Sequence, residues 1–161
     1  MAKDLHIVGF RVGRETFGVP IALVHEIVRV PEITAVPDCP SYVEGVINLR
    51  GKIVPVVDLR KRFGQTPTHN PKKNRVLVAE LEGKMVGLMV DAASEVLKLP
   101  PSEIDKPPAI VEEPEQNYVT GVGKLNGRLI ILVDLSKILR SNELRRLSDV
   151  ADGQNTTVVS G

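Results

Sequence analysis

The stretch VEGVINLRGKIVPVVDLRKRF, residues Val43 to Phe63, decides which kind of fold this chain adopts. Its middle is short, apolar and rich in β-branched residues, and turn residues flank it, which favours a buried strand over a helix. Pro55 interrupts that strand. Because proline cannot donate a hydrogen bond, the strand is predicted to lie at a sheet edge or to bulge there. Asp58 ends the strand, where its carboxylate can cap a short helix, so the stretch predicts strand, Arg-Gly turn, strand and capped helix.

The same pattern recurs downstream in VTGVGKLNGRLIILVDLSKIL, residues Val119 to Leu139. The two segments align without a gap and share the turn glycine, the apolar strand and the Asp-Leu pair that follows it. They differ at the turn itself, where Arg50 is matched by Asn126. The sequence therefore contains an internal duplication whose two copies are not equivalent at the turn.

A weaker echo, at a slightly shorter offset, pairs Gly18–Val28 with Gly87–Leu97. Its identical residues include Gly18 with Gly87 and Glu26 with Glu95. The two echoes together predict a single domain over about residues 5–147, with repeat halves of about residues 10–64 and 76–140.

Length and composition narrow the class of protein. The chain has 161 residues, 42% hydrophobic and 25% charged, which is typical of one globular domain without a membrane-spanning apolar run. Its single cysteine, Cys39, excludes an internal disulfide framework and fits a reducing cytoplasm. The net charge of +1, from 21 basic and 20 acidic side chains, gives no general attraction to nucleic acid or to an anionic membrane.

Periodicity predicts the remaining secondary structure. The further predicted strands are Leu5–Val12, Thr16–Val19, Arg75–Leu81 and Lys84–Val90. Pro20 suits the first turn of a helix, and apolar residues at helical spacing extend that predicted helix to Val28. On this helix Glu26 would lie on the exposed face with His25. Asp91–Leu99 is predicted to repeat this element as a short helical or bent segment.

The polar segments predict loops and a tail. Gly64–Asn74, GQTPTHNPKKN, is predicted to be a mobile loop. A C-terminal helix is predicted from Leu135 to about Leu147, and the polar residues 148–161 are predicted to be disordered. Many short strands, glycine turns and short helices together predict paired β-barrels.

The residues predict no catalytic centre, metal site or cofactor. Asp58 and Asp134 raise the hypothesis of a paired-carboxylate acid protease, but each precedes Leu-x-Lys at a strand-to-helix junction, where helix capping explains it. An Asn at either position should therefore cap nearly as well. None of the three histidines has a partner at metal-ligand spacing, and Cys39 has no nearby general base in the sequence.

Nucleic-acid binding through a small β-barrel is the alternative function. Two basic clusters, Arg60 to Arg62 and Lys72 to Arg75, could contact phosphates, although a solvated helix face and a loop also explain them. Only five aromatic residues occur, so stacking platforms for single strands are scarce.

Four segments together resemble the CheW family of bacterial chemotaxis coupling proteins. They are FGVPIALVHEIVRV, VEGVINLRGKIVPVVDLRKRFG, VGLMVDAASEVL and YVTGVGKLNGRLIILVDLSKIL. The pattern Gly-x-x-Asn-Leu-Arg-Gly-x-x-x-Pro-x-x-Asp-Leu-Arg, from Gly45 to Arg60, is specific to that family. The resemblance implies a mainly β fold of two pseudo-repeated, five-stranded SH3-like barrels that share a core, with short helices and a C-terminal helix.

The resemblance also implies a function in chemotaxis signal transduction. A member of this family would be a non-catalytic, cytoplasmic adaptor without a cofactor, recruited to membrane-associated receptor arrays. It would link the cytoplasmic tips of chemoreceptors (methyl-accepting chemotaxis proteins) to the regulatory domain of the histidine kinase CheA, in a two-component system. The partner-binding positions that carry over by motif are Val24, Glu26, Gly45, Asn48, Arg50, Val76 and Gly87.

Arg50 and Glu26 are the charged members of that set. Arginine is enriched at binding hot spots. A role confined to the architecture of the turn would more readily reappear in the second repeat, where Asn126 stands instead of Arg50. The single occurrence of the arginine therefore favours a role in binding.

Overall fold

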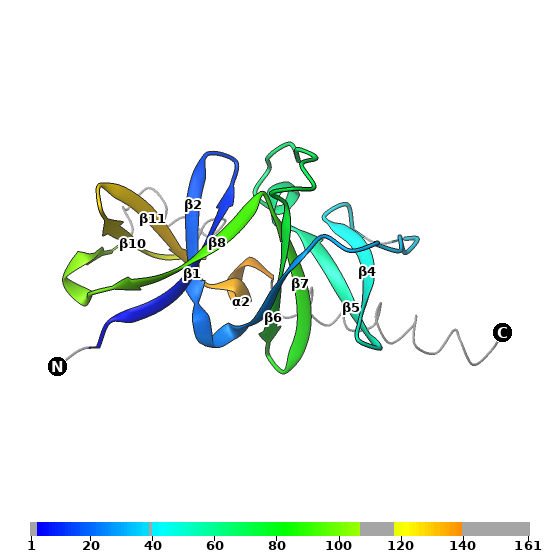
Figure 1. Cartoon of the computed structure of the whole chain (residues 1–161), viewed down its shortest axis with the longest axis horizontal. Helices are drawn as coiled ribbons and strands as arrows, with labels where there is room; N and C mark the ends of the chain where they lie inside the picture. The colour runs from blue at the N-terminus through cyan, green and yellow to red at the C-terminus, as the bar shows by residue number, and fades with distance from the viewer. Residues whose placement is uncertain (1–2, 39, 107–117, 140–161) are drawn as a thin grey trace.

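The computed structural model describes residues 3–38, 40–106 and 118–139. Within these ranges the chain consists mainly of β-strands joined by short turns (Figure 1). The elements are β1 (Leu5–Val12), β2 (Glu15–Pro20), the 3₁₀ turn η1 (Ile21–Leu23), β3 (Val24–Arg29), β4 (Val43–Leu49), β5 (Lys52–Asp58), α1 (Leu59–Arg62), β6 (Arg75–Leu81), β7 (Lys84–Val90), β8 (Ala92–Leu99), the 3₁₀ turn η2 (Pro101–Glu103), β9 (Ile104–Asp105), β10 (Val119–Leu125), β11 (Arg128–Val133) and α2 (Leu135–Ile138). The predicted mainly β fold is confirmed.

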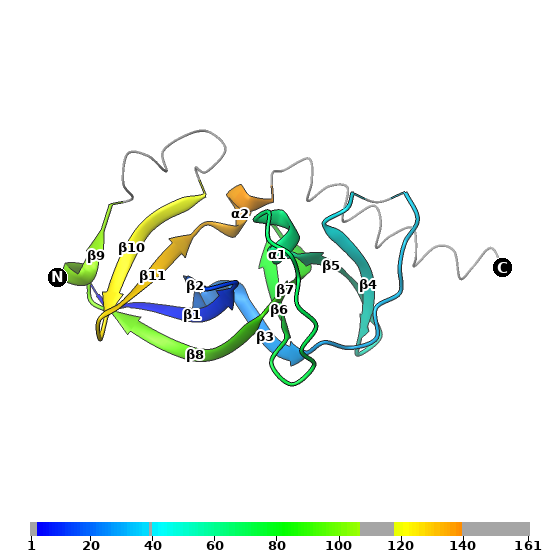
Figure 2. The same cartoon turned by 90° about the horizontal axis from the view of Figure 1, so that it is seen from above.

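The strands form two sheets that lie side by side along the long axis of the molecule (Figures 1 and 2). Sheet A has the strand order β8-β1-β2-β11-β10-β9, and sheet B has the order β3-β6-β7-β5-β4. Both sheets curl strongly, and the short helices α1 and α2 lie near the junction between them (Figure 2). The assignment of each sheet as an SH3-like barrel stays a prediction.

The two sequence repeats exchange their first hairpins. The β1–β2 hairpin of the first repeat lies in sheet A, beside β8, β10 and β11 of the second repeat. Conversely, the β6–β7 hairpin of the second repeat lies in sheet B with β3, β4 and β5. Each exchanged hairpin joins its sheet through one parallel pairing, β2 with β11 and β7 with β5. Neither repeat therefore completes a sheet by itself.

The weaker sequence echo has a packing explanation. A Cβ atom added at Gly18 would lie 2.6 Å from the Ile7 side chain, and one added at Gly87 would lie 2.9 Å from the Val76 side chain. In the alignment of the echo, Gly18 corresponds to Gly87 and Ile7 corresponds to Val76. The glycine of each exchanged hairpin therefore makes room for a β-branched side chain on the neighbouring strand of that hairpin.

Buried apolar side chains form three clusters. The largest contains Val8 and Phe10 of sheet A together with Leu77 and Leu88 of sheet B, so it is shared between the sheets. A second cluster lies among the strands of sheet B, and a third among those of sheet A. The shared core predicted for the two halves is therefore present.

Thermal unfolding is expected to occur in one transition, because the exchanged hairpins and the shared core leave neither sheet a complete folding unit. Differential scanning calorimetry should give a calorimetric enthalpy equal to the van't Hoff enthalpy. Two separated transitions would show instead that each sheet folds independently.

The helix predicted from Pro20 to Val28 is wrong. Residues Ile21–Leu23 form only a 3₁₀ turn, and β3 follows as a strand paired with β6. Half-buried and exposed residues alternate along β3, as in a strand with one face toward the core. Glu26 accordingly is half-buried on the same face as Val28, beyond a register shift that follows Val24, rather than on a wet helical face.

The second predicted helical or bent segment, Asp91–Leu99, is also a strand. Residues Ala92–Leu99 form β8 and pair with β1 along almost their whole length. The C-terminal helix begins at Leu135 as predicted, and α2 ends at Ile138. Leu139, the C-cap of α2, is extended, so the predicted continuous helix to about Leu147 is wrong at this residue. Residues 140–147 and the predicted tail lie outside the described residues.

Pro55 is not at an edge, since β5 lies between β7 and β4. Its partner in β4, Val46, makes its backbone hydrogen bonds to Thr34, at 2.9 Å each, and so makes none to Pro55. On the other side of β5, the parallel pairing with β7 begins only at Val56. An interior proline is tolerated here because the ladder needs no donor from its nitrogen.

Candidate partner-binding surface

Glu26 of β3 and Arg50 of the β4–β5 turn form an ion pair on sheet B. Arg50 Nη2 donates to Glu26 Oε1 over 2.8 Å. The hydrogen bond and the negative charge of Glu26 raise the pKa of the Arg50 guanidinium. Because β3 and β4 are opposite edges of sheet B, the pair links the two ends of the curled sheet. The Arg50 side chain remains 74% exposed and that of Glu26 26% exposed, so the guanidinium is accessible to a partner.

Arg50 occupies a backbone position that arginine disfavours. Arg50 and Gly51 both have positive φ, at 53° and 88°, the pattern of a type I′ hairpin turn. Asn126 and Gly127 repeat this geometry in the second half, at 52° and 78°. Asparagine tolerates the left-handed region far better than arginine does. The turn therefore favours Asn at this position, and Arg50 is retained there against that preference.

Asn48 supports this turn. Its Oδ1 accepts a hydrogen bond from the backbone nitrogen of Gly51 over 2.8 Å, and the residue is exposed. The structure thus brings Glu26, Asn48 and Arg50 together at the β4–β5 hairpin, next to β3. These three residues are referred to below as the hairpin site.

The second repeat carries a related ion pair. Glu95, the counterpart of Glu26, lies 3.2 Å from Arg128 across sheet A. Arg128 follows shortly after Asn126, so the ion pair reappears although the arginine is not at the turn position. Arg128 is thus a structural counterpart of Arg50 outside the turn, and the single occurrence of arginine at the turn no longer favours a binding role by itself. Support for a binding role rests instead on the strained backbone and the exposure of Arg50.

The other predicted site residues lie deeper in sheet B. Val76 is completely buried, and Gly45 and Gly87 lie within strands β4 and β7. A Cβ atom at Gly45, where φ is 142°, would lie 2.1 Å from the carbonyl oxygen of Thr34. Val24 is half-buried at the start of β3. Val76 and the two glycines can influence a partner only by shaping the sheet on which the hairpin site lies.

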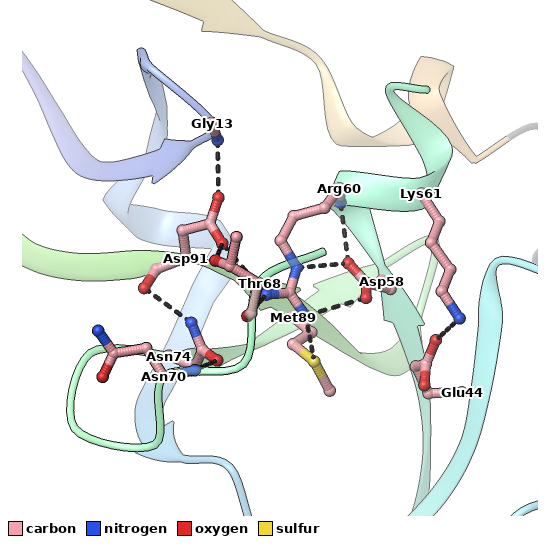
Figure 3. Close-up of polar contacts among 10 residues, drawn as sticks. All are labelled: Gly13, Glu44, Asp58, Arg60, Lys61, Thr68, Asn70, Asn74, Met89 and Asp91. Carbon is pink, nitrogen blue, oxygen red and sulfur yellow. Dashed lines mark hydrogen bonds and ion pairs between the residues drawn. The ribbon is translucent and has the colours of Figure 1, made fainter. Parts of the chain in front are cut away.

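The sequence interpretation missed a buried ion pair between Asp58 and Arg60. The sequence favours a solvated helix face for Arg60, but its side chain is only 5% exposed and that of Asp58 only 2%. Arg60 Nε donates to Asp58 Oδ1 over 2.9 Å, and Nη2 donates to Oδ2 over 3.0 Å (Figure 3). Burial lowers the pKa of Arg60, but the hydrogen bonds and charges of Asp58 and Asp91 outweigh that effect and leave it raised.

The predicted helix caps are confirmed. Asp58 Oδ1 accepts from the backbone nitrogen of Arg60, and Asp134 Oδ1 accepts from that of Ser136, each over 2.9 Å. Asp58 ends a strand of sheet B and Asp134 follows a strand of sheet A, and both play the same local role. Among the residues that the structure describes, no group of three or more His, Cys, Asp or Glu side chains could hold a metal ion.

The aromatic side chains pack into the core shared by the two sheets. Phe10, Phe17, Phe63 and Tyr118 form a continuous row, with ring centroids 5.8, 5.0 and 5.4 Å apart. Tyr42 packs against the same cluster. All five aromatic residues are therefore engaged between the sheets, which disfavours an exposed base-stacking platform of the kind that binds single-stranded nucleic acid.

In the described ranges, no helix is both long and apolar enough to span a membrane.

Comparison with known proteins gives consistent results. The sequence model of the CheW-like domain family matches residues 6–143 of this chain. The Chemotaxis protein CheW of Klebsiella aerogenes is 37% identical over 142 residues, covering 88% of this chain and 86% of that protein. The Chemotaxis protein CheW of Rhizobium meliloti is 37% identical over 137 residues, covering 85% and 88% respectively.

A solved structure agrees with the fold. The crystal structure of the scaffolding protein TtCheW from Thermoanaerobacter tengcongensis superposes with a TM-score of 0.77 at 37% identity, over 89% of this chain and 96% of that one. The family model matches most of the chain, and the relatives are 37% identical to it over most of their own length. The chain therefore belongs to the CheW family of chemotaxis scaffold proteins.

Proposed function

We propose that this chain is a non-catalytic cytoplasmic adaptor that couples the tips of chemoreceptors to the regulatory domain of the histidine kinase CheA. In this role it would be recruited to membrane-associated receptor arrays. Support comes from family membership over residues 6–143 and from relatives named as chemotaxis and scaffolding proteins. Exchanged hairpins and a shared core give a single body with separate faces, which suits a protein that holds two partners together.

The observation that carries the proposal for the binding site is the conformation of Arg50. Its exposed guanidinium is held in place by Glu26 and presented from a turn that would be more stable with asparagine. A residue kept against local backbone preference marks a candidate functional position. An exposed arginine with further donors beside an acidic partner suits a protein interface, where arginine is enriched.

Size-exclusion chromatography with purified components tests the adaptor function. A receptor-tip fragment and the CheA regulatory domain should co-elute as one complex only when this chain is present. A fluorescent single-stranded oligonucleotide, in a parallel experiment, should not shift with the chain at physiological salt. Oligonucleotide binding without co-elution of the two proteins would favour the nucleic-acid alternative.

Glu26→Ala is expected to weaken that complex without unfolding the chain. The substitution removes the carboxylate that orients Arg50, but its ion pair is on the surface and such pairs contribute little stability. The melting temperature should stay within a few degrees, and affinity for one partner should fall about tenfold. Glu95→Ala, which breaks the related pair in sheet A, is the matched control for loss of a surface ion pair.

A further inference from the structure

All the buried polar or charged side chains in the described part of the chain belong to one region. They are Asp58, Arg60 and Asn74, each no more than 5% exposed. Asp91 joins them with a side chain that is 21% exposed. Figure 3 shows these residues converging at the end of sheet B, beside α1 and the β1–β2 turn. They are referred to below as the junction network.

Arg60 is the centre of the junction network, and every N–H donor of its guanidinium is used. Two of its nitrogens bind Asp58, as described above. Nη1 donates to the carbonyl oxygen of Thr68 over 2.7 Å and to Asp91 Oδ1 over 3.1 Å. Nη2 also lies 3.1 Å from the sulfur of Met89. A planar group with donors in fixed directions therefore sets the positions of several other residues at once.

Asp91 extends the network into sheet A. It stands between β7 of sheet B and β8 of sheet A, so the chain crosses from one sheet to the other at this residue. Its Oδ2 accepts from the backbone nitrogen of Gly13, in the β1–β2 turn of sheet A, over 2.7 Å. The hydrogen bonds Asp58–Arg60–Asp91–Gly13 thus run from the end of sheet B to a turn of sheet A (Figure 3).

The same network holds the loop that was predicted to be mobile. Besides the Thr68 carbonyl bond to Arg60, Thr68 Oγ1 donates to Asp91 Oδ1 over 3.2 Å. Asn74 Nδ2 donates to the carbonyl oxygen of Asp91 over 3.1 Å, and Asn74 Oδ1 accepts from Asn70 over 2.9 Å. The loop forms part of the wall of a pocket of about 480 Å³, which Arg60 also lines. The loop is therefore tied to the junction network near its middle and at its end.

At the corresponding end of sheet A, the described residues form no counterpart of the junction network. Asp134 retains its cap, but Ser136 stands where Arg60 would be, and the weaker echo aligns Asp91 with Ala22. The network is therefore not needed to build a hairpin and a capped helix. A buried ion pair is also a poor source of stability, because desolvation offsets most of its attraction. Its directional bonds suit a different role, which is to fix geometry.

We propose that Arg60 is a positioning residue that fixes the orientation of sheet A relative to sheet B and holds the loop 64–74 in place. Because the guanidinium bonds sheet B and the loop directly and reaches the β1–β2 turn of sheet A through Asp91, its loss releases two movements together. For an adaptor, the consequence is that surfaces on the two sheets keep one relative orientation; this consequence alone rests on the proposed function. The geometry itself is a property of the isolated chain.

Distance measurements between spin labels test this positioning role without any partner. Labels at Ile27 on sheet B and Val96 on sheet A, in a Cys39→Ser background, are suitable because both side chains are exposed. Double electron–electron resonance should give one narrow distance distribution for the parent protein. Arg60→Met and the milder Asp91→Asn should broaden or shift it, whereas Arg128→Gln, which removes an ion pair within sheet A, should not.

Limited trypsin digestion supplies the second readout, at Lys72 and Lys73 in the loop. Both variants are expected to be cut there about tenfold faster than the parent while still folded, because the loop opens locally. An unchanged distance distribution and unchanged cleavage in either folded variant would overturn the proposal. If Asp91→Asn failed to fold, the junction network would be a folding determinant and the proposal would also be wrong. A failure of the partner-binding experiments leaves these measurements unaffected, so the two proposals fail separately.

Discussion

Asp58→Asn is expected to lower the free energy of unfolding by about 3 kcal/mol, whereas Asp134→Asn should change it by less than about 0.5 kcal/mol. Both aspartates cap a helix, and asparagine caps nearly as well, so the capping loss is small at both positions. The difference arises because Asp58 also neutralises Arg60, and both side chains are almost fully buried. Removing the charge of Asp58 leaves a buried guanidinium with only Asp91 as a carboxylate partner.

Urea denaturation of the two variants, followed by circular dichroism, measures this difference. The slope of unfolding free energy against urea should be the same for both, since the same surface is exposed on unfolding. Asp58→Leu should also leave Arg60 buried without this partner. Adding Arg60→Met to Asp58→Leu should recover much of the unfolding free energy that Asp58→Leu loses, because an apolar pair of similar volume removes the unpaired charge. Equal, small losses for Asp58→Asn and Asp134→Asn would mean that the buried pair contributes nothing beyond the cap, as the sequence alone suggested.

Arg50→Glu is expected to weaken binding to the receptor tip or to the CheA regulatory domain by about tenfold or more. The substitution places a second carboxylate next to Glu26 and removes the exposed guanidinium of the hairpin site. The melting temperature should fall only modestly, because the Arg50 side chain is 74% exposed and surface ion pairs contribute little stability. Isothermal titration calorimetry against each partner measures the loss.

Arg128→Glu is the matched control for charge reversal. It inverts an arginine that is also on a hairpin and also paired with a glutamate, but in sheet A. Affinity for the partner that needs Arg50 should be unchanged in this variant. If Arg50→Glu collapsed the fold, Arg50 would be a structural residue and the hairpin site would be wrongly assigned.

Local signals in the sequence were sufficient for much of this fold. The Arg-Gly and Asn-Gly pairs between apolar runs predicted two hairpins, and Asp58 and Asp134 predicted two helix caps. Each of these features depends on residues within a few positions of each other. Asn48 and Arg50 of the hairpin site belong to one turn, whereas their contact with Glu26 depends on the tertiary fold. All three were predicted as partner-binding positions from the family resemblance.

β3 was predicted incorrectly because its apolar residues fit two periods. The spacing of Val24 and Val28 satisfies both a helical face and one face of a strand. Pairing with β6, from residue 75 onward, decides in favour of the strand, and that partner lies in the other repeat. Short segments of this kind take their structure from tertiary contacts that the local pattern does not contain.

The junction network was missed for the same physical reason. A basic residue followed by two other basic residues, as Arg60 is, is most often solvated on a helix surface. Its burial depends on Asp91 and on the loop at Thr68, neither of which is its neighbour in the sequence. The exchange of hairpins between the repeats likewise could not be predicted, because a duplicated sequence does not specify which repeat supplies which strand of a sheet.

The affinity of Arg50→Asn for the receptor tip and the CheA regulatory domain tests the central claim most directly. Asparagine is the residue found at the matching turn position, Asn126, so this variant should fold as well as the parent or melt a few degrees higher. If the hairpin site binds a partner, titration of this equally stable variant should show at least about tenfold weaker binding to one of the two proteins. Unchanged affinity for both would contradict the account, because Arg50 would then be neither a structural requirement nor a contact.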